Sequence, residues 1–459
     1  MADLDLSTTR RLHVIGVGGP GMSALAIVLA QMGHRVSGSD IRETAVLGNV
    51  RAAGVTVTIG HDPRLVSGCD AVTYSTAVPL DNVEVRAANE LGVRVMHRSE
   101  MLAAICARTT ALGVAGTHGK TTTSSLLRAA MSSLEPNFVI GGDVIDLGTG
   151  AAWTGGPHMV VEADESDGTY RTLPLRGAII TNIDVDHLDH FGSFDDLQRD
   201  FAAFMSGVDG PVVVGWDDDI ARTVARSAGL RQLVTYGADA DCHVKWSDVF
   251  AENDAMRFMI SGTFGQRTVR LPLRGRHNVA NACGALALAI EFGVDIDEAI
   301  RGVESFGGVG RRFDVVGRAD GATFVDDYAH LPREIAAVLA AARAGGEWKR
   351  IVAVFQPNRY NRMATMAPEY ADAFVDADVV VLTDIYSSGT TLIPGVTGHL
   401  VVDAVRSRHP DSRVEWVASR TDLARAVSAL VEPGDVCISM GCGDIEFLPR
   451  EILEVRGAL

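Results

Sequence analysis

Residues 13–26, HVIGVGGPGMSALA, join a short apolar run to a glycine-rich turn and the start of a helix-like segment. Gly16, Gly18 and Gly21 in this stretch have the spacing G-x-G-x-x-G. A turn of this kind at a helix N-terminus points several backbone N–H groups at one place, where a pyrophosphate binds. The stretch therefore predicts a Rossmann-like unit that binds a nucleotide, and it is also how a dehydrogenase could begin.

Outward from this turn, β-rich and helix-like runs alternate along the chain. The order of strand, glycine-containing turn and helix begins again in residues 109–133, and a third start falls at residues 322–330. This alternation is typical of βαβ units around parallel sheets. We predict an α/β protein of three domains: a Rossmann-like domain over residues 1–108, a central P-loop ATPase-like domain with a parallel sheet over residues 109–313, and a C-terminal Rossmann-like domain over residues 314–459.

The composition excludes several classes of protein. The formal net charge of -17 argues against a general binder of nucleic acid or of anionic membranes, because a phosphate surface selects for basic proteins. The N-terminus lacks the apolar core of a signal peptide, and no later window resembles a membrane span, so we expect a cytoplasmic protein without membrane insertion. The six cysteines form no C-x-x-C pair and are expected to be free thiols. The sequence leaves a monomer and a homodimer open.

The sharpest local signal is GTHGKTTT, residues 116–123. Its backbone N–H groups would face one place at a helix N-terminus, Lys120 adds a positive charge, and Thr121 offers a hydroxyl to a magnesium ion. Together these groups suit a nucleoside triphosphate. The strict pattern G-x-x-x-x-G-K-[ST] is not met, because Val114 stands five residues before Gly119, and a chance loop is the alternative.

An acidic cluster follows a β-rich run in VVEADESDGTY, residues 160–170. It contains Glu162, Asp164, Glu165 and Asp167. Acidic residues at the carboxyl end of a strand reach the ligand-facing edge of a doubly wound sheet, where they can hold magnesium beside phosphates. A solvated acidic turn is the commoner fate of such a cluster, and only the upstream P-loop favours the metal.

Three weaker patterns lie further along the chain. TNIDVDHLDH, residues 181–190, approaches a metallohydrolase ligand run, but Val185 replaces its first histidine and a helix-capping loop explains it equally well. Asn278 and Asn281 are three apart on an expected helix, so both amides could reach one ligand, although Asn278 could also cap that helix. Two arginines at the same spacing could converge on one carboxylate. They are Arg359 and Arg362.

Taken in order, these motifs resemble the Mur ligase family. The motifs run from Gly16 to Ile445, nearly the whole chain, and are GVGGPGMSALA, SGSD, AGTHGKTTT, VEADESDG, TNIDVDH, GRHNVANA, GRRF, DDYAHLP, FQPNRYNR and GCGDI. The segment EADESD and the glycine-rich start are similar to the branch of the family that adds L-alanine to UDP-N-acetylmuramate.

The resemblance implies that the first domain holds a UDP-sugar rather than NAD. Both ligands present a pyrophosphate, so the turn suits either one, and the second nucleotide site favours the ligase because hydride transfer needs none. The UDP-sugar-binding residues implied are Gly16, Gly18, Gly19, Gly21, Met22, Ser23 and Asp40.

The reaction implied is amide formation driven by ATP. The lactyl carboxylate of UDP-N-acetylmuramate would attack the γ-phosphate to give an acyl phosphate, and the amine of L-alanine would then displace phosphate. Charge accumulates on the phosphoryl oxygens, so positioning and cations supply most of the catalysis. Two magnesium ions are implied, one on Thr121 and Glu162 and the other on His187. Catalysis is expected to depend on Lys120, Glu162, His187 and Arg359.

The ATP site implied by the resemblance spans several motifs. The P-loop would bind ATP through Gly116, Thr117, Gly119, Lys120, Thr121 and Thr122. Asn278 and Asn281 would face the adenine side. Arg312 would contact the phosphates, and Asp327 would bind the ribose.

The amino-acid site would lie in the third domain, on Tyr328, Arg359 and Arg362. Five positions there depart from the pattern of the branch, and they bear on amino-acid selectivity. They are Ala329 in place of glycine, Leu331 and Asn358 in place of histidine, Thr390 in place of an acidic residue, and Cys442 in place of alanine.

Three other functions stay open on the sequence. A recycling ligase would join a whole peptide to UDP-N-acetylmuramate, although its acidic motif usually differs from EADESDG. An NAD-dependent oxidoreductase with an ATP-binding domain would need a nicotinamide site. A nucleotide switch would hydrolyse ATP slowly without needing a UDP-sugar.

Overall fold

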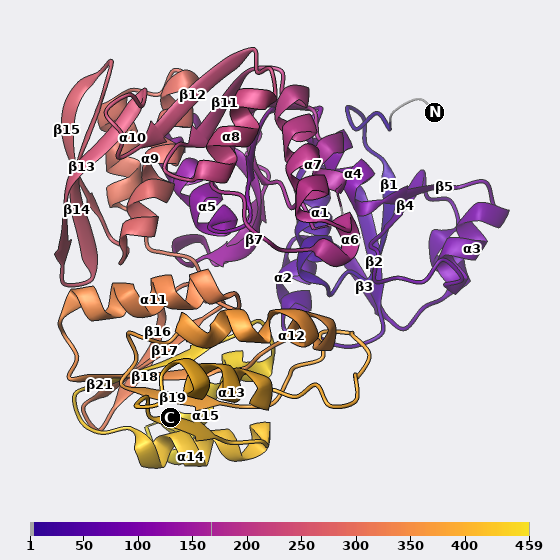
Figure 1. Cartoon of the computed structure of the whole chain (residues 1–459). Helices are drawn as coiled ribbons and strands as arrows, with labels where there is room; N and C mark the ends of the chain where they lie inside the picture. The colour runs from indigo at the N-terminus through magenta and orange to yellow at the C-terminus, as the bar shows by residue number, and fades with distance from the viewer. Residues whose placement is uncertain (1–3, 167, 459) are drawn as a thin grey trace. The chain divides into compact units, whose positions relative to one another are not determined.

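The computed structural model describes residues 4–166 and 168–458, apart from the side chain of Asp189 (Figure 1). Asp167, one of the acidic candidates above, lies outside these residues. The chain forms three sheets, each with helices packed on it, so the predicted α/β class is confirmed. No helix among the described residues is both long and apolar enough to span a membrane.

The first sheet has five parallel strands in the order β3-β2-β1-β4-β5. The strands are β1 (Arg11–Ile15), β2 (Arg35–Asp40), β3 (Thr56–Ile59), β4 (Ala71–Tyr74) and β5 (Arg94–His97). Helices α1 (Pro20–Gln31), α2 (Val46–Ala52) and α3 (Val83–Glu90) lie between successive strands, and α4 (Arg98–Cys106) follows β5. The strand order reverses between β1 and β4, and the glycine-rich turn follows β1 at that switch point.

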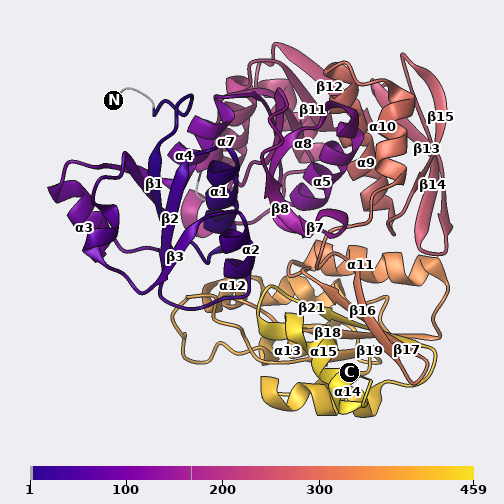
Figure 2. The same cartoon turned by 180° about the vertical axis from the view of Figure 1, so that it is seen from behind.

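Helix α1 is apolar nearly all round, and eight of its twelve residues are buried. An isolated surface helix would keep a polar face, so this pattern requires a cover on both sides. The second cover comes from β7 (Asn137–Val144) and β8 (Thr149–Ala152), which run beside α1 (Figure 2). The side chain of Gln31, at the end of α1, accepts a hydrogen bond from the backbone N–H of Trp153 at 2.7 Å.

The second sheet has ten strands in the order β15-β14-β13-β12-β11-β10-β6-β9-β7-β8. The neighbours from β12 to β7 pair in parallel, whereas β7 and β8 form an antiparallel hairpin. The further strands are β6 (Thr110–Ala115), β9 (His158–Glu162), β10 (Leu175–Ile180), β11 (Pro211–Gly215), β12 (Gln232–Gly237), β13 (Val244–Glu252), β14 (Ala255–Gly262) and β15 (Gly265–Leu271). The helices are α5 (Lys120–Ala130), α6 (Leu188–Phe191), α7 (Phe194–Gly207), α8 (Asp219–Ser227), α9 (Arg276–Glu291) and α10 (Ile296–Glu304).

The third sheet has the order β16-β17-β21-β18-β19-β20, and only the β16–β17 pair is antiparallel. Its strands are β16 (Asp314–Ala319), β17 (Ala322–Asp327), β18 (Arg350–Phe355), β19 (Val379–Leu382), β20 (Val414–Trp416) and β21 (Asp435–Met440). Helices α11 (Pro332–Gly345), α12 (Tyr360–Met366) and α13 (His399–Arg408) pack on one face, and α14 (Leu423–Leu430) and α15 (Leu448–Val455) pack on the other.

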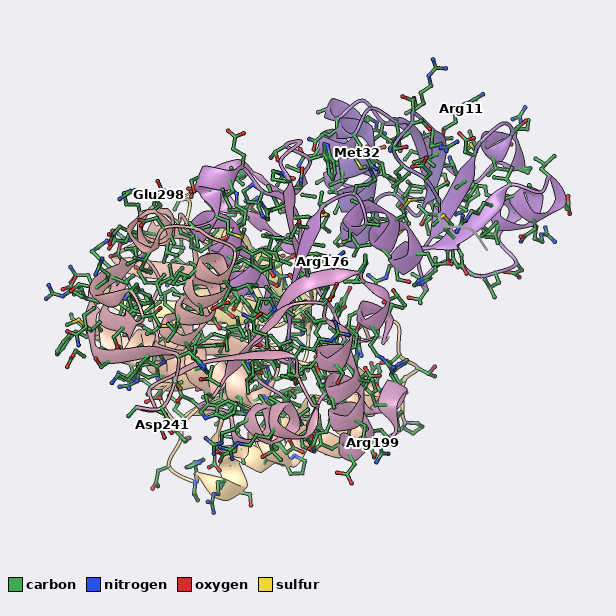
Figure 3. The ribbon with its side chains drawn as sticks, turned by 90° about the horizontal axis from the view of Figure 1, so that it is seen from above. Arg11, Met32, Arg176, Arg199, Asp241 and Glu298 are labelled. Atoms are coloured by element: carbon green, nitrogen blue, oxygen red, sulfur yellow. The ribbon has the colours of Figure 1, made fainter. Side chains whose placement is uncertain are left out.

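The chain divides into two compact units. The first contains residues 1–247, 259–269 and 280–307, and the second contains residues 248–258, 270–279 and 308–459. The first and most of the second sheet thus share one unit, and Arg11, Met32 and Arg176 of this unit are labelled in Figure 3. The three domains predicted from the sequence, with boundaries near residues 108 and 313, stay a prediction.

Candidate active site

The P-loop, residues 116–119, follows β6, the strand at which the strand order of the second sheet reverses. Strands β9 and β10 flank β6 on opposite sides, so the loop opens into a topological switch point. Gly116 and Gly119 have positive φ angles of 126° and 80°. A side chain at Gly116 would overlap Thr181 Oγ1, and a Cβ at Gly119 would lie 2.8 Å from Asn281 Oδ1. Both positions therefore require glycine.

The segment after β10 holds the P-loop in shape. The backbone N–H of His118 donates to Asn182 Oδ1 at 2.9 Å, and Asn182 Nδ2 donates to the His118 carbonyl at 3.0 Å. Thr181 Oγ1 donates to the same carbonyl at 2.7 Å. The backbone N–H of Asp184 donates to Thr117 Oγ1 at 2.9 Å. Residues 181–184, TNID, thus hold the P-loop in place by hydrogen bonds. The sequence pattern suggests metal ligands here and gives no sign of this role.

The ammonium group of Lys120, the first residue of α5, is held against the P-loop by hydrogen bonds. Its Nζ donates to the carbonyls of Gly116 at 2.7 Å and Thr117 at 3.2 Å, and to Glu165 Oε1 at 2.9 Å. Burial by itself would lower the pKa of Lys120, but Glu165 and Asp164 outweigh it and raise that pKa. The lysine is therefore a permanent cation beside the loop amides, as phosphate binding requires.

Glu165 is the carboxylate that sequence reasoning undervalued. It is 1% exposed, and burial raises its pKa to about 7 although Lys120 opposes this shift. Among the described residues, none forms a hydrogen bond with its Oε2. The signal available in the sequence was its place in EADESD, three residues after Glu162, but the partner lysine lies 45 positions away.

Thr121 and Glu162 meet as the sequence predicted. Thr121 Oγ1 donates to Glu162 Oε1 at 3.1 Å, and the backbone N–H of Gly141 donates to Glu162 Oε2 at 2.8 Å. A Cβ at Gly141 would lie 2.9 Å from both carboxylate oxygens, so the glycine leaves room for this approach. A hydroxyl and a carboxylate beside a P-loop are the oxygen donors that magnesium prefers.

His187 lies with a second set of donors. Ligand atoms of Asp164, Glu165 and His187 lie within 4.8 Å of one another, the single such group found within residues 4–166 and 168–458. Burial would raise the pKa of Asp164, but Lys120 and hydrogen bonds from Ser166 lower it. Two carboxylates, one with a buried unpaired oxygen, and an imidazole fit a divalent cation. The structure thus pairs His187 with Asp164 and Glu165, and Thr121 with Glu162.

Helix α9 carries both predicted asparagines. Asn281 lies beside the P-loop, with its Oδ1 close to Gly119. Asn278 Nδ2 donates to the carbonyl of Arg274, one turn earlier, at 2.8 Å. Asn278 is the third residue of α9 and not the residue that precedes it, so its amide ties the first turn to the chain before the helix, and the ligand role stays a prediction.

The glycine-rich turn of the first sheet is tied to β2. The backbone N–H of Gly18 donates to Asp40 Oδ2 at 2.8 Å, and those of Gly16 and Val17 donate to the Ser39 carbonyl. A Cβ at Gly21 would lie 3.4 Å from a guanidinium nitrogen of Arg98, a cation that sequence reasoning missed. The turn thus combines backbone amides with a nearby positive charge, which suits a pyrophosphate.

The remaining predicted residues of this turn pack inward. Gly19 precedes α1, and its carbonyl accepts from the backbone N–H of Ser23 at 2.9 Å. Ser23 Oγ donates to the Pro20 carbonyl at 2.8 Å, and Met22 is buried in the core. In this arrangement Met22 and Ser23 shape the turn.

In the third sheet, Tyr328 follows β17 and its ring lies between two guanidinium groups. The Cζ atoms of Arg311 and Arg312 lie 5.0 and 5.2 Å from the ring centroid. Asp327 accepts backbone hydrogen bonds from Phe313 and Ala329, both at 2.7 Å. Burial raises the pKa of Asp327, and Arg312 opposes this shift. The structure therefore brings Arg312, Asp327 and Tyr328 together.

Arg359 and Arg362 lie at the start of α12. Arg359 has a φ of 61°, an uncommon conformation for a residue with a side chain. Arg362 is 7% exposed, and its Nη1 donates to Asn358 Oδ1 at 3.0 Å. Of the other positions that depart from the expected pattern, Ala329 and Leu331 are buried in the core of this unit.

Comparison with known proteins decides the family. Three family models match the chain in order: the Mur ligase family catalytic domain over residues 11–110, the Mur ligase middle domain over residues 114–289, and the glutamate ligase domain of the Mur ligases over residues 311–443. The chain belongs to the Mur ligase family. The resemblance inferred from the motifs is therefore confirmed.

Relatives within the Mur ligase family cover nearly the whole chain. A UDP-N-acetylmuramate–L-alanine ligase of Halorhodospira halophila is 42% identical over 96% of this chain and 93% of its own length. One of Sinorhizobium medicae is 39% identical over 97% and 98%. Among solved structures, a UDP-N-acetylmuramate-alanine ligase of Thermotoga maritima is 28% identical with a TM-score of 0.82, covering 98% of this chain and 99% of that one.

Proposed function

We propose that this chain joins L-alanine to the lactyl carboxylate of UDP-N-acetylmuramate with the hydrolysis of ATP, giving UDP-N-acetylmuramoyl-L-alanine, ADP and phosphate. The observation that carries the proposal is that one chain contains two glycine-rich nucleotide turns, and that only the second has a lysine and a hydroxyl–carboxylate pair. Two nucleotide substrates account for two such turns. The names of the relatives in the family support the same reaction.

The first step needs activation because a carboxylate is a poor electrophile without a good leaving group. Attack of the lactyl carboxylate on the γ-phosphate of ATP converts it into an acyl phosphate. Lys120 and the backbone N–H groups of residues 119–122, at the start of α5, would hold the phosphates and stabilise the charge that builds on the phosphoryl oxygens. The amine of L-alanine then attacks the acyl carbon, and phosphate leaves from the tetrahedral intermediate.

Two sets of residues are suited to magnesium. Thr121 and Glu162 would hold one ion, and His187, with Asp164 and Glu165, would hold a second. When bound, such ions neutralise negative charge on the phosphates. The protein's own part is to keep these oxygen and nitrogen donors beside the P-loop, since Glu162 is anchored by the Gly141 amide and Glu165 by Lys120.

The substrate sites follow the motifs. The turn around Gly18, closed by Asp40, would bind the UDP-sugar. Asn278 and Asn281 would face the adenine of ATP, Asp327 would bind its ribose, and Arg312 would contact its phosphates. Tyr328, Arg359 and Arg362 would hold the amino acid. We place the enzyme in the cytoplasm, as a monomer or homodimer, in the synthesis of peptidoglycan precursors on which cell shape and division depend.

The test is phosphate release from ATP in the presence of Mg²⁺ and UDP-N-acetylmuramate. L-alanine, glycine, L-serine and the tripeptide L-Ala-γ-D-Glu-meso-diaminopimelate are added separately. Turnover that needs both the sugar nucleotide and L-alanine supports the proposal. Turnover with the tripeptide alone would place the chain in the recycling branch, and reduction of NAD without use of ATP would identify an oxidoreductase.

A further inference from the structure

Asn358 lies between β18 and α12, directly before Arg359 in the chain and four residues before Arg362. It is 3% exposed, and its backbone forms a parallel bridge with Tyr386. Its Oδ1 accepts from Arg362 Nη1 at 3.0 Å in a buried contact. A guanidinium carries only donors, so the amide oxygen must face Arg362 and the orientation of the side chain is fixed.

The contact between Asn358 and Arg362 has an energetic reason. Arg362 is 7% exposed, and a buried guanidinium loses its hydration unless acceptors inside the protein replace water. Asn358 supplies one such acceptor without adding a negative charge. This contact therefore does not neutralise the positive charge of the guanidinium.

The backbone of Arg359 and Tyr360, which follow Asn358, is held by residues of the 386–390 segment. The backbone N–H of Arg359 donates to the Tyr386 carbonyl at 2.9 Å, and that of Tyr360 donates to Thr390 Oγ1 at 3.0 Å. Thr390 thereby satisfies an N–H group in the first turn of α12, which has no partner within the helix. Two of the residues that depart from the expected pattern, Asn358 and Thr390, thus act on one short stretch.

Cys442 is a third departing residue close to this stretch. Burial raises the pKa of its thiol, whereas a hydrogen bond with Ser388 and the charges of Arg362 and Arg359 lower it. A small, uncharged side chain here leaves the charge of the two arginines intact. All three departures are neutral: Asn358 contacts Arg362, Thr390 contacts the backbone of Tyr360, and the thiol of Cys442 is influenced by the charges of both arginines.

We propose that Asn358 is a positioning residue of the amino-acid site, whose amide oxygen fixes the Arg362 guanidinium in the orientation that receives the carboxylate of the incoming amino acid. This inference rests on the proposed function, and specifically on the role of Arg362 in binding L-alanine. Loss of the amide oxygen would remove one of the contacts that orient the Arg362 guanidinium. Binding of the amino acid would weaken, while binding of ATP and of the UDP-sugar would not change.

The test compares Asn358→Leu, which has a similar volume but no acceptor, with Asn361→Leu, the same exchange at an exposed position of α12. Steady-state KM values are measured for L-alanine, ATP and UDP-N-acetylmuramate. We expect Asn358→Leu to raise the KM for L-alanine about ten-fold to a hundred-fold and to leave the other two within about two-fold. Asn358→Gln, which keeps a neutral amide oxygen on a longer side chain, is expected to recover part of the loss.

An unchanged KM for L-alanine in Asn358→Leu would overturn the inference, and so would an equal rise in all three KM values, which indicates a general loss of structure. If Asn358→Leu does not fold, as judged by its thermal melt, Asn358→Ala replaces it with the same expected split. Asn361→Leu is expected to match the wild type in all three constants.

A double-mutant cycle separates this inference from the proposed function. If Asn358 acts through Arg362, Asn358→Leu has no further effect on the KM for L-alanine in an Arg362→Ala background. If Arg362→Ala raises that KM and Asn358→Leu adds its full effect to it, the inference is wrong and the role of Arg362 stands. If Arg362→Ala leaves the KM unchanged, the assignment of Arg362 to the amino-acid site is wrong.

Discussion

Lys120 Nζ lies 2.9 Å from Glu165 Oε1, so the P-loop lysine is held by a buried carboxylate from the segment that follows β9. The same lysine donates to two loop carbonyls, and the three acceptors together fix the ammonium group at the mouth of the loop. A flexible lysine would have to be ordered each time that ATP binds. Glu165 removes this cost in advance.

Replacement of Glu165 by glutamine tests this relationship. The amide of the new side chain could still accept one hydrogen bond, but it would not balance the charge of Lys120. We expect kcat/KM for ATP to fall about ten-fold, because a charged hydrogen bond is replaced by a neutral one. The matched control is Glu291→Gln on α9, an exposed position in the same compact unit. Equal kcat/KM values in both variants would show that Glu165 does not prepare the lysine.

Lys120→Ala removes the cation itself. Because charge accumulates on the phosphoryl oxygens during transfer, we expect kcat for ATP-dependent ligation to fall by at least about a hundred-fold. The chain offers a close control in Lys245→Ala, since Lys245 lies in β13 and is one of only three lysines. Full ligation by the Lys120→Ala protein would refute the P-loop assignment.

Thr121→Val is expected to change the need for metal. The exchange keeps the shape of the side chain and removes the hydroxyl that meets Glu162. The Mg²⁺ concentration for half-maximal rate should rise about ten-fold, and chelation by EDTA should abolish ligation in both proteins. Thr223→Val, on the exposed face of α8, is the control and should titrate like the wild type. A Thr121→Val protein with an unshifted Mg²⁺ titration would exclude this hydroxyl from the metal site.

Gly18→Ala is expected to affect the UDP-sugar alone. An added Cβ would lie 2.8 Å from Asp40 Oδ2, so the turn and the carboxylate would have to move apart. Overpacking of this kind costs about 1–3 kcal/mol, and we expect a rise of about ten-fold in the KM for UDP-N-acetylmuramate. Gly48→Ala on α2, where nothing lies within 4 Å, is the control. A parallel rise in the KM for ATP would contradict a local effect.

Asp326 predicts a pH dependence of stability in the second unit. Burial raises its pKa to about 6, although Arg311 opposes the shift. A carboxyl group with a raised folded-state pKa binds more protons in the native state than in the unfolded state between about pH 4 and pH 6. Its contribution to stability is thus complete below about pH 4 and is lost as the pH rises through about 6.

Asp326→Asn removes this titration and keeps an acceptor for Arg311, whose Nε donates to Asp326 Oδ2 at 2.9 Å. The difference in free energy of unfolding between variant and wild type should therefore change between about pH 4 and pH 7, by at most about 3 kcal/mol and in favour of the variant at the higher pH. Thermal melts at several pH values measure this. A difference that does not vary with pH would show that Asp326 has an ordinary pKa.

Local patterns in the sequence predicted the elements and much of the site, because strand, turn and helix signals are short-range. The three starts near residues 13, 109 and 322 each became a strand of a separate sheet. Thr121 and Glu162, which the sequence predicted to share a metal ion, form a hydrogen bond, because they lie near the carboxyl ends of the neighbouring parallel strands β6 and β9.

The missed features depend on contacts between distant positions. The ten-strand width of the second sheet, the β7–β8 hairpin and the hold of Asn182 on the P-loop have no short-range signature. Arg311 has no distinguishing signal in the sequence beyond its place in GRRF, yet its guanidinium lies over the Tyr328 ring and pairs with Asp326. The identity of such partners is decided by which chain segments meet, and periodicity carries no information about that.

The burial of α1 on both sides has a mechanical consequence. This helix begins at the glycine-rich turn after β1 and packs along β7, and β7 pairs with β9, whose last residue is Glu162. A rigid path of packed elements thus links one nucleotide turn to the carboxylate beside the other. We expect these two turns to move as a single block, so that any hinge motion during turnover bends the chain elsewhere and leaves their spacing unchanged.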